Sequence, residues 1–182
     1  GFWGEKAKEI GEIKIDWNIW GKKADTQTID AIQNINKLRE TVEKEIGEKI
    51  PKELDEMVTA LVASESAFDK NATNMEGAVV GLGQISKGAL EDINKKLKDS
   101  GSKWKFTLED MQDPVKNLQA MMIYFGIVSE RNDHKLWESI LYWKGWGKEI
   151  KKARSKIFRS VLRFISFTSA RESPYSNPRR HD

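Results

Sequence analysis

The segment between Leu54 and Phe68 carries the pattern that most constrains the fold of this chain. Its apolar side chains recur at intervals of one, three and four residues, at Leu54, Met57, Val58, Leu61 and Val62. This spacing predicts an amphipathic helix with one face packed against a core. Pro51 and the acidic residues after it suit the first turn of such a helix. Glu65 and Phe68 continue the stripe, so a carboxylate occupies a position that the pattern assigns to a buried side chain.

This placement of Glu65 has a chemical consequence. A carboxylic acid buried at the negative end of a helix tends to keep its proton near neutral pH, because both surroundings disfavour the charge. A protonated carboxylic acid is what a general acid must be. The alternative is a glutamate at a frayed helix end, half exposed or bonded to nearby backbone, and the stripe alone leaves both open.

Three sequence blocks follow one another in order. The first is Glu65-Ser66-Ala67-Phe68 with the later run Gly77-Ala78-Val79-Val80-Gly81-Leu82-Gly83-Gln84. The second joins Asp113-Pro114-Val115-Lys116-Asn117-Leu118 to Tyr124-Phe125, and the third is Leu141-Tyr142-Trp143-Lys144-Gly145. Over about residues 51–150 they resemble the lytic transglycosylase and goose-type lysozyme superfamily. That family's pattern is a helix ending in Glu-Ser with an aromatic two residues after the Ser, and then Gly-Ala-x-Gly-Leu-Met-Gln. It continues with Asp-Pro-x-x-Asn-Ile followed by Tyr-Leu, and ends with Ala-Tyr-Asn-x-Gly.

The sequence departs from that family pattern at three places. One extra residue lies between Gly77 and Gly81, and Gly83 stands where the family has Met. Trp143 stands where the family has a substrate-contacting Asn. The glutamate, the glutamine and both tyrosines of the pattern are kept.

The resemblance implies a mainly α, lysozyme-like fold with a small β element. It also implies cleavage of peptidoglycan glycan strands at the β-1,4 bond between N-acetylmuramic acid (MurNAc) and N-acetylglucosamine (GlcNAc). Glu65 would be the single general acid and base, and the 6-hydroxyl of the muramic sugar would attack its own anomeric carbon, giving 1,6-anhydro-MurNAc ends. Gln84, Tyr124 and Tyr142 would hold the acetamido groups or brace Glu65. Ser66 would contact substrate or bond the helix end.

Two other functions remain open at this stage. A goose-type lysozyme would hydrolyse the same bond with a second carboxylate, for which Glu76, Glu91 and Asp92 are the candidates. A protein of another class would be an inactive wall-binding or structural module, which Trp143 favours, or a helical interaction module with an accidental likeness.

Further helices are predicted on either side of Glu65. Isoleucine, leucine and valine recur over residues 26–50, and Asp25 or Thr26 suits the N-cap. A helix over residues 86–98 would be capped by Ser86, and another would start at Asp113-Pro114 with its methionines in the core.

Two features between these helices suggest a ligand site. Residues 69–83 read as a loop with a strand or hairpin at residues 78–82, whose glycines would let a ligand approach closely. Trp104 and Phe106 would line a sugar site or anchor the core.

Composition excludes several classes of function. The chain of 182 residues has no cysteine and two distant histidines, so we expect no metal and no cofactor. No glycine run matches a nucleotide-binding motif, and no apolar run is long enough to span a membrane. We expect a monomer that acts at the bacterial cell wall, either periplasmic, secreted or phage-associated; no signal peptide is visible.

The ends of the chain are read from charge and aromatic content. Ten Lys or Arg oppose three Asp or Glu over residues 148–182, whereas the rest is mildly acidic. The basic helix predicted within residues 151–167 would close the domain, or bind an anionic wall or membrane surface; nucleic acid is disfavoured. Residues 1–24 read as an irregular aromatic segment, a short strand or a sugar platform. We therefore expect an N-terminal extension (1–50), a lysozyme-like domain (51–167) and a flexible tail (168–182).

Overall fold

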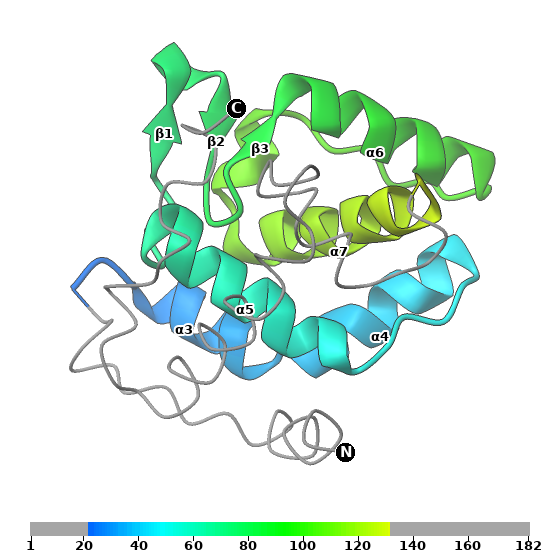
Figure 1. Ribbon diagram of the computed structural model, residues 1–182, viewed down its shortest axis with the longest axis horizontal. Coiled ribbons are helices and arrows are strands. Elements are labelled where there is room, and N and C mark those ends of the chain that lie inside the picture. Colours follow the sequence, from blue (N-terminus) through cyan, green and yellow to red (C-terminus); the bar gives the residue numbers. More distant parts are fainter. Residues whose placement is uncertain (1–21, 132–182) are drawn as a thin grey trace, which may run out of the picture.

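The computed structural model describes residues 22–131, which form a helical body with one small sheet (Figure 1). The helices are α3 (Thr26–Gln33), α4 (Ile35–Ile46), α5 (Glu53–Ser66), α6 (Lys87–Asp99) and α7 (Pro114–Arg131). The strands are β1 (Thr73–Asn74), β2 (Val79–Val80) and β3 (Ile85–Ser86), with 3-10 turns η1 (Met75–Gly77) and η2 (Glu109–Gln112). This arrangement confirms a mainly α fold with a small β element.

The N-terminal helix predicted over residues 26–50 is two helices. Asp25 caps α3, since its Oδ1 accepts from the backbone N–H of Thr28 at 2.8 Å. Asn34 then breaks the helix: its Nδ2 donates to the carbonyl of Asp30 at 2.8 Å, an option that helix-forming side chains lack. The second helix ends at Ile46 because Gly47 adopts a left-handed conformation with φ 69°. The prediction of one continuous helix to residue 50 was therefore wrong.

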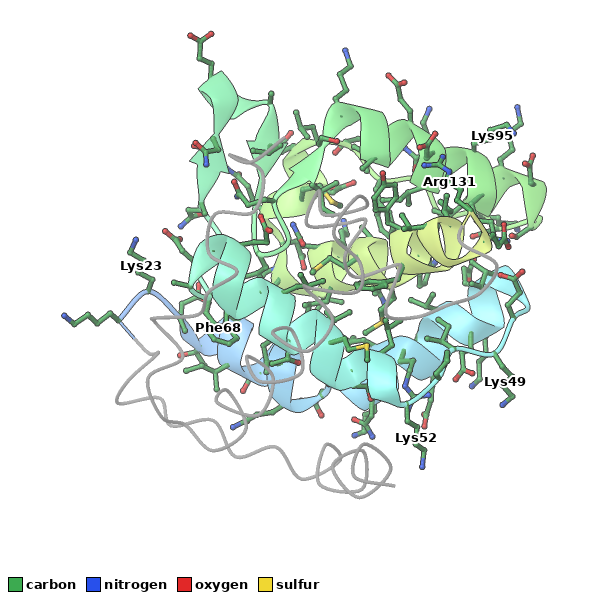
Figure 2. All side chains as sticks on the ribbon, viewed as in Figure 1. Lys23, Lys49, Lys52, Phe68, Lys95 and Arg131 are labelled. Carbon is green, nitrogen blue, oxygen red and sulfur yellow. The ribbon has the colours of Figure 1, made fainter. Side chains whose placement is uncertain are left out.

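Helix α5 bears out the predicted stripe. Its five apolar members, Leu54, Met57, Val58, Leu61 and Val62, are all buried. The helix begins at Glu53, two residues after Pro51, and ends at Ser66. Phe68, the last member of the stripe, lies beyond the helix and is fully buried; Figure 2 shows it close to the C-terminal end of α5.

Helix α7 is the centre of the body, because it contacts α3, α4, α5 and α6. Asp113 caps it, accepting from the backbone N–H of Val115 at 2.8 Å. Its core residues include both predicted methionines: Leu118, Met121, Met122 and Phe125. Ile32 and Val42 from α3 and α4 belong to the same hydrophobic cluster. The helices before residue 50 thus share their core with those after it.

The small sheet follows α5 and precedes α6. It is antiparallel in the order β1-β2-β3, pairing Thr73 with Val80 and Val80 with Ile85. The strand predicted within residues 78–82 corresponds to β2. Ser86 caps α6 as predicted, accepting from the N–H of Ala89 at 3.1 Å.

Trp104 and Phe106 anchor the loop between α6 and η2. Phe106 is buried, Trp104 is partly buried, and their ring centroids lie 6.0 Å apart. Asn94 fixes the loop because its Oδ1 accepts from the N–H of Phe106 at 2.9 Å and its Nδ2 donates to the same residue's carbonyl at 2.8 Å. These contacts favour the core-anchoring alternative over a sugar site.

Several predictions fall outside residues 22–131: the segment before residue 22, Tyr142 with its block, the basic helix within 151–167 and the tail. Among the described helices, none is both long and apolar enough to cross a membrane.

Candidate active site

Glu65 lies in the last turn of α5, where the chain turns toward the small sheet. Its side chain is half-buried, between the apolar stripe and solvent. The helix end presents the carbonyl pole of the helix to a carboxylate at this position. A proton donor must point in a fixed direction toward the leaving oxygen, so the backbone around Glu65 decides how this acid can act.

The backbone after Glu65 is strained and tightly hydrogen bonded. Ala67 and Phe68 adopt left-handed conformations with φ 51° and 63°. The N–H of Ala67 donates to the carbonyl of Ala63 at 3.1 Å, and that of Asp69 to the carbonyl of Ser66 at 3.0 Å. Left-handed backbone costs a residue with a Cβ about 1–2 kcal/mol. Such conformations persist where the surrounding structure enforces them, and they cluster at functional sites.

Strain of this kind is confined to one stretch of the described residues. Their four non-glycine residues with positive φ are Ala67, Phe68, Glu76 and Gln84. All four lie between the end of α5 and the start of β3, so the backbone irregularity of residues 22–131 is concentrated around the loop that follows Glu65.

Asn117 of α7 ties that loop to the central helix. Its Oδ1 accepts from the N–H of Gly83 at 2.9 Å. Its Nδ2 donates to the carbonyls of Val80 at 3.1 Å and Met111 at 2.8 Å. Asn117 is fully buried, so all three bonds are shielded from water. A single amide therefore sets the distance between α7, the β2–β3 loop and η2.

The glycines of this loop serve packing rather than access. A Cβ on Gly81, which has φ 81°, would collide with the carbonyl oxygen of Met111 and the amide nitrogen of Asn117. A Cβ on Gly83 would lie 2.5 Å from the Sδ of Met121. The prediction that these glycines admit a ligand is corrected for Gly81 and Gly83: the close neighbour is the protein's own η2 and α7.

Gln84 is committed to the same loop. Its Nε2 donates to the carbonyls of Ala72 at 2.9 Å and Gly81 at 3.0 Å, and the residue is buried. These bonds close the hairpin from inside and place the amide nitrogen on backbone. A substrate-binding role of Gln84 remains a prediction.

The other predicted contacts are placed as follows. Ser66 is buried and its Oγ donates to the carbonyl of Val62 at 3.0 Å, which is the helix-end role. Tyr124 is partly buried against the core, and it contributes, after Asp92, to the raised pKa of the Arg131 guanidinium. Tyr142 lies outside the described residues.

The three candidate second carboxylates have different surroundings. Asp92 on α6 forms an ion pair with Arg131 of α7 at 3.1 Å, and this hydrogen bond raises the pKa of the Arg131 guanidinium. Glu76 is exposed on η1 and Glu91 is exposed on α6. Within residues 22–131 no three His, Cys, Asp or Glu side chains are grouped so as to hold a metal ion.

Two cavities lie elsewhere on the described body. One of about 300 Å³ lies among Ile46 of α4, Leu54 of α5, the loop between these two helices, and residues of α7 that include Met122. Another of about 320 Å³ lies between α3 and the start of α7. Glu65 lines neither of these cavities, so they do not form a pocket around the acid.

Two anchoring interactions were not predicted from the sequence. Asn117 belongs to the second of the three family blocks, but its role depends on contacts with residues 34 and 37 positions away. Lys70 pairs with Asp25, 2.7 Å between Nζ and Oδ2, and nothing in the local sequence of either residue signals this contact.

A helical domain in which a helix-end glutamate precedes a small antiparallel sheet is the architecture of lysozyme-like glycosidases. The family model described as Transglycosylase SLT domain matches residues 45–160. The chain belongs to this family, which supports cleavage of glycosidic bonds in peptidoglycan at the level of the family. The match includes Glu65, Gln84 and Asn117, whereas α3 and nearly all of α4 precede it. No curated protein and no solved structure matches the chain.

Proposed function

We propose that the protein is a lytic transglycosylase that cleaves the MurNAc–GlcNAc β-1,4 bond with Glu65 as its single general acid and base. The observation that carries the proposal is the placement of Glu65: half-buried at the end of α5, before a strained turn, inside the family match. An acid in this position is held by the fold rather than by a flexible loop.

The proposed reaction needs only one carboxyl group. The Glu65 carboxylic acid donates its proton to the glycosidic oxygen as the bond from that oxygen to the anomeric carbon of MurNAc breaks. The 6-hydroxyl oxygen of the same MurNAc then forms a bond to the anomeric carbon. The Glu65 carboxylate takes the proton of that hydroxyl, which restores the acid and leaves a 1,6-anhydro ring.

The surroundings of the candidate second acids favour this route over hydrolysis. A hydrolase would need a carboxylate free to hold a water molecule opposite the leaving group. Asp92 is already paired with Arg131, and Glu76 and Glu91 are exposed, where water screens their charge. The single-acid reaction requires none of these three carboxylates.

The experiment is digestion of purified peptidoglycan followed by mass spectrometry of the released muropeptides. Wild type is expected to release anhydro-muropeptides, and Glu65→Gln to lose at least about 10²-fold in rate because the side chain no longer carries a transferable proton. Glu109→Gln, the same chemical change at an exposed position on η2, is the matched control and should keep full activity.

Other outcomes would replace the proposal with one of its alternatives. Fully hydrated reducing ends would indicate a goose-type lysozyme, and Glu76→Gln, Glu91→Gln and Asp92→Asn would then identify the second carboxylate. Sedimentation with peptidoglycan without product release would indicate an inactive wall-binding module. Neither binding nor release would leave a helical interaction module.

The proposed setting follows from the substrate. The partner is the glycan strand and the place of action is the bacterial cell wall, reached by export to the periplasm, by secretion or within a phage particle. We propose a monomer without a metal or cofactor, and an anionic wall or membrane surface as the partner of the basic residues 148–182, which lie outside the described part of the chain.

A further inference from the structure

We infer that the helix pair α3–α4, which precedes nearly all of the family match, belongs to the catalytic apparatus, and that Lys70 is the positioning residue through which α3 holds the turn after Glu65. This inference rests on the proposed function, because it assigns a role in the rate of that reaction. The family match starts at residue 45, so membership alone does not predict it.

Lys70 joins the turn to the first residues of α3 by two contacts. Its Nζ lies 2.7 Å from Oδ2 of Asp25 and donates to Oε1 of Gln27 at 2.8 Å. The other oxygen of the Asp25 carboxylate caps α3 through the N–H of Thr28. One carboxylate thus connects the start of α3 to the segment that follows Glu65.

The backbone between Glu65 and Lys70 is tightly held. The N–H of Asp69 donates to the carbonyl of Ser66 at 3.0 Å, and the N–H of Ala72 donates to the carbonyl of Asp69 at 3.1 Å. Phe68, between Ser66 and Asp69, is fully buried. A shift of Lys70 is therefore transmitted to the end of α5, because the residues between the two are each held by a backbone hydrogen bond or by burial.

A second ion pair holds α5 near its N-terminal end. Arg39 of α4 donates from Nε to Oδ1 of Asp55 at 2.9 Å and also pairs with Glu43 at 3.3 Å. Arg39 and Asp55 are both buried. Residues 25–43 thus hold the helix that carries Glu65 near its start and just beyond its end. In the view of Figure 1, α3 lies next to α5, and α4 diverges from α5 at an angle.

The Lys70 link is better suited to positioning than to stability. The Lys70 side chain is 26% exposed and that of Asp25 41%, and ion pairs this exposed contribute little to the free energy of unfolding. A small misplacement of a catalytic acid, by contrast, lowers the rate steeply. The hydrogen bond from Lys70 also lowers the pKa of Asp25 to about 2, so the pair stays charged at neutral pH.

The test compares three variants of the full chain by peptidoglycan digestion kinetics. Lys70→Met is expected to lower kcat roughly tenfold with apparent KM unchanged within about twofold, because Glu65 is misplaced while the binding surface stays intact. Lys70→Arg keeps the charge and should restore most of kcat. Lys96→Met is the matched control: its Nζ also bridges two carboxylates, Glu48 at 3.1 Å and Glu130 at 3.4 Å, with 20% exposure.

Amide hydrogen exchange separates failure of this inference from failure of the proposed function. Lys70→Met should speed exchange at residues 67–72, and Lys96→Met should not; this readout needs no enzymatic activity. Wild-type kcat in Lys70→Met, an equal loss in Lys96→Met, no recovery in Lys70→Arg, or a loss of kcat without faster exchange would each overturn the inference. An inactive wild type would overturn the proposed function, and unchanged exchange in Lys70→Met would then refute the mechanical link on its own.

Discussion

Asp55→Asn is expected to raise the stability of the protein relative to wild type at neutral pH, compared with the same difference in mild acid. This is expected although the change removes one member of a buried ion pair. Asp55 is only 3% exposed and contacts Arg39 through a single hydrogen bond of 2.9 Å. Loss of water around its carboxylate raises the pKa to about 6, against the opposing effect of the Arg39 charge. The negative charge of Glu43 also raises the pKa of Asp55, and the positive charge of Lys52 also lowers it.

The sign and size follow from the two protonation equilibria. The ordinary pKa of Asp is 3.8 and that of Asp55 in the folded protein is about 6. Between these values the folded state binds a proton that the unfolded state has released, so wild type loses stability as the pH rises through this window. A difference of roughly two pKa units corresponds to about 3 kcal/mol. Asparagine does not titrate, so the variant escapes this loss.

Urea unfolding of both proteins between about pH 4 and pH 7 measures the effect. At about pH 4 the Asp55 side chain of folded wild type is protonated, and the asparagine side chain of the variant is neutral as well. The difference in unfolding free energy there reports mainly the change of shape and hydrogen bonding. From that baseline the relative stability of Asp55→Asn should rise by up to about 3 kcal/mol. Asp99→Asn, an exposed change at the end of α6, should stay within about 0.5 kcal/mol of wild type throughout. A flat or falling difference for Asp55→Asn would show that Arg39 outweighs burial.

Two further changes test the loop around Gly81 by urea unfolding. Asn117→Ala removes three hydrogen bonds to buried backbone groups and should cost about 3 kcal/mol or more; a loss below about 1 kcal/mol would mean that the loop is not held by this amide. Gly81→Ala forces a Cβ against the carbonyl of Met111, whereas Gly77→Ala at φ 85° meets open space, so Gly77→Ala should cost only about 1 kcal/mol and Gly81→Ala clearly more. Equal losses would refute the steric argument.

Periodicity and capping chemistry predicted the helical body well. The apolar members of the α5 stripe are buried, and Ser86 caps α6 as predicted. Asp25, one of two predicted candidates, caps α3, and α7 begins at Asp113-Pro114 as predicted. These features depend on neighbours within a few residues, which the sequence displays directly.

Features that depend on distant neighbours were not predictable in the same way. The break at Asn34 depends on a local contact, the hydrogen bond from its side chain to the carbonyl of Asp30. Because asparagine also occurs within helices, the sequence alone does not predict this bond. Asn117 acts across more than thirty residues, and Lys70 pairs with Asp25 forty-five residues earlier in the chain. Such pairings depend on how the helices pack against α7, which periodicity does not specify.

The turn after Glu65 is the least predictable part of the site and also its main constraint. Alanine and phenylalanine carry no signal for left-handed backbone, and their strain amounts to about 2–4 kcal/mol together. Burying a phenylalanine side chain contributes about 1.5–3 kcal/mol, so the full burial of Phe68 largely offsets that strain.

The turn is thus held by two anchors within three residues: Phe68 in the core and Lys70 at the surface. The buried anchor alone fixes the turn at a single point, Phe68. The surface anchor to α3 adds a second fixed point. Under the proposed function, this second point holds the direction of the one acid that donates and then accepts the proton, and it is supplied by a helix ahead of the family region.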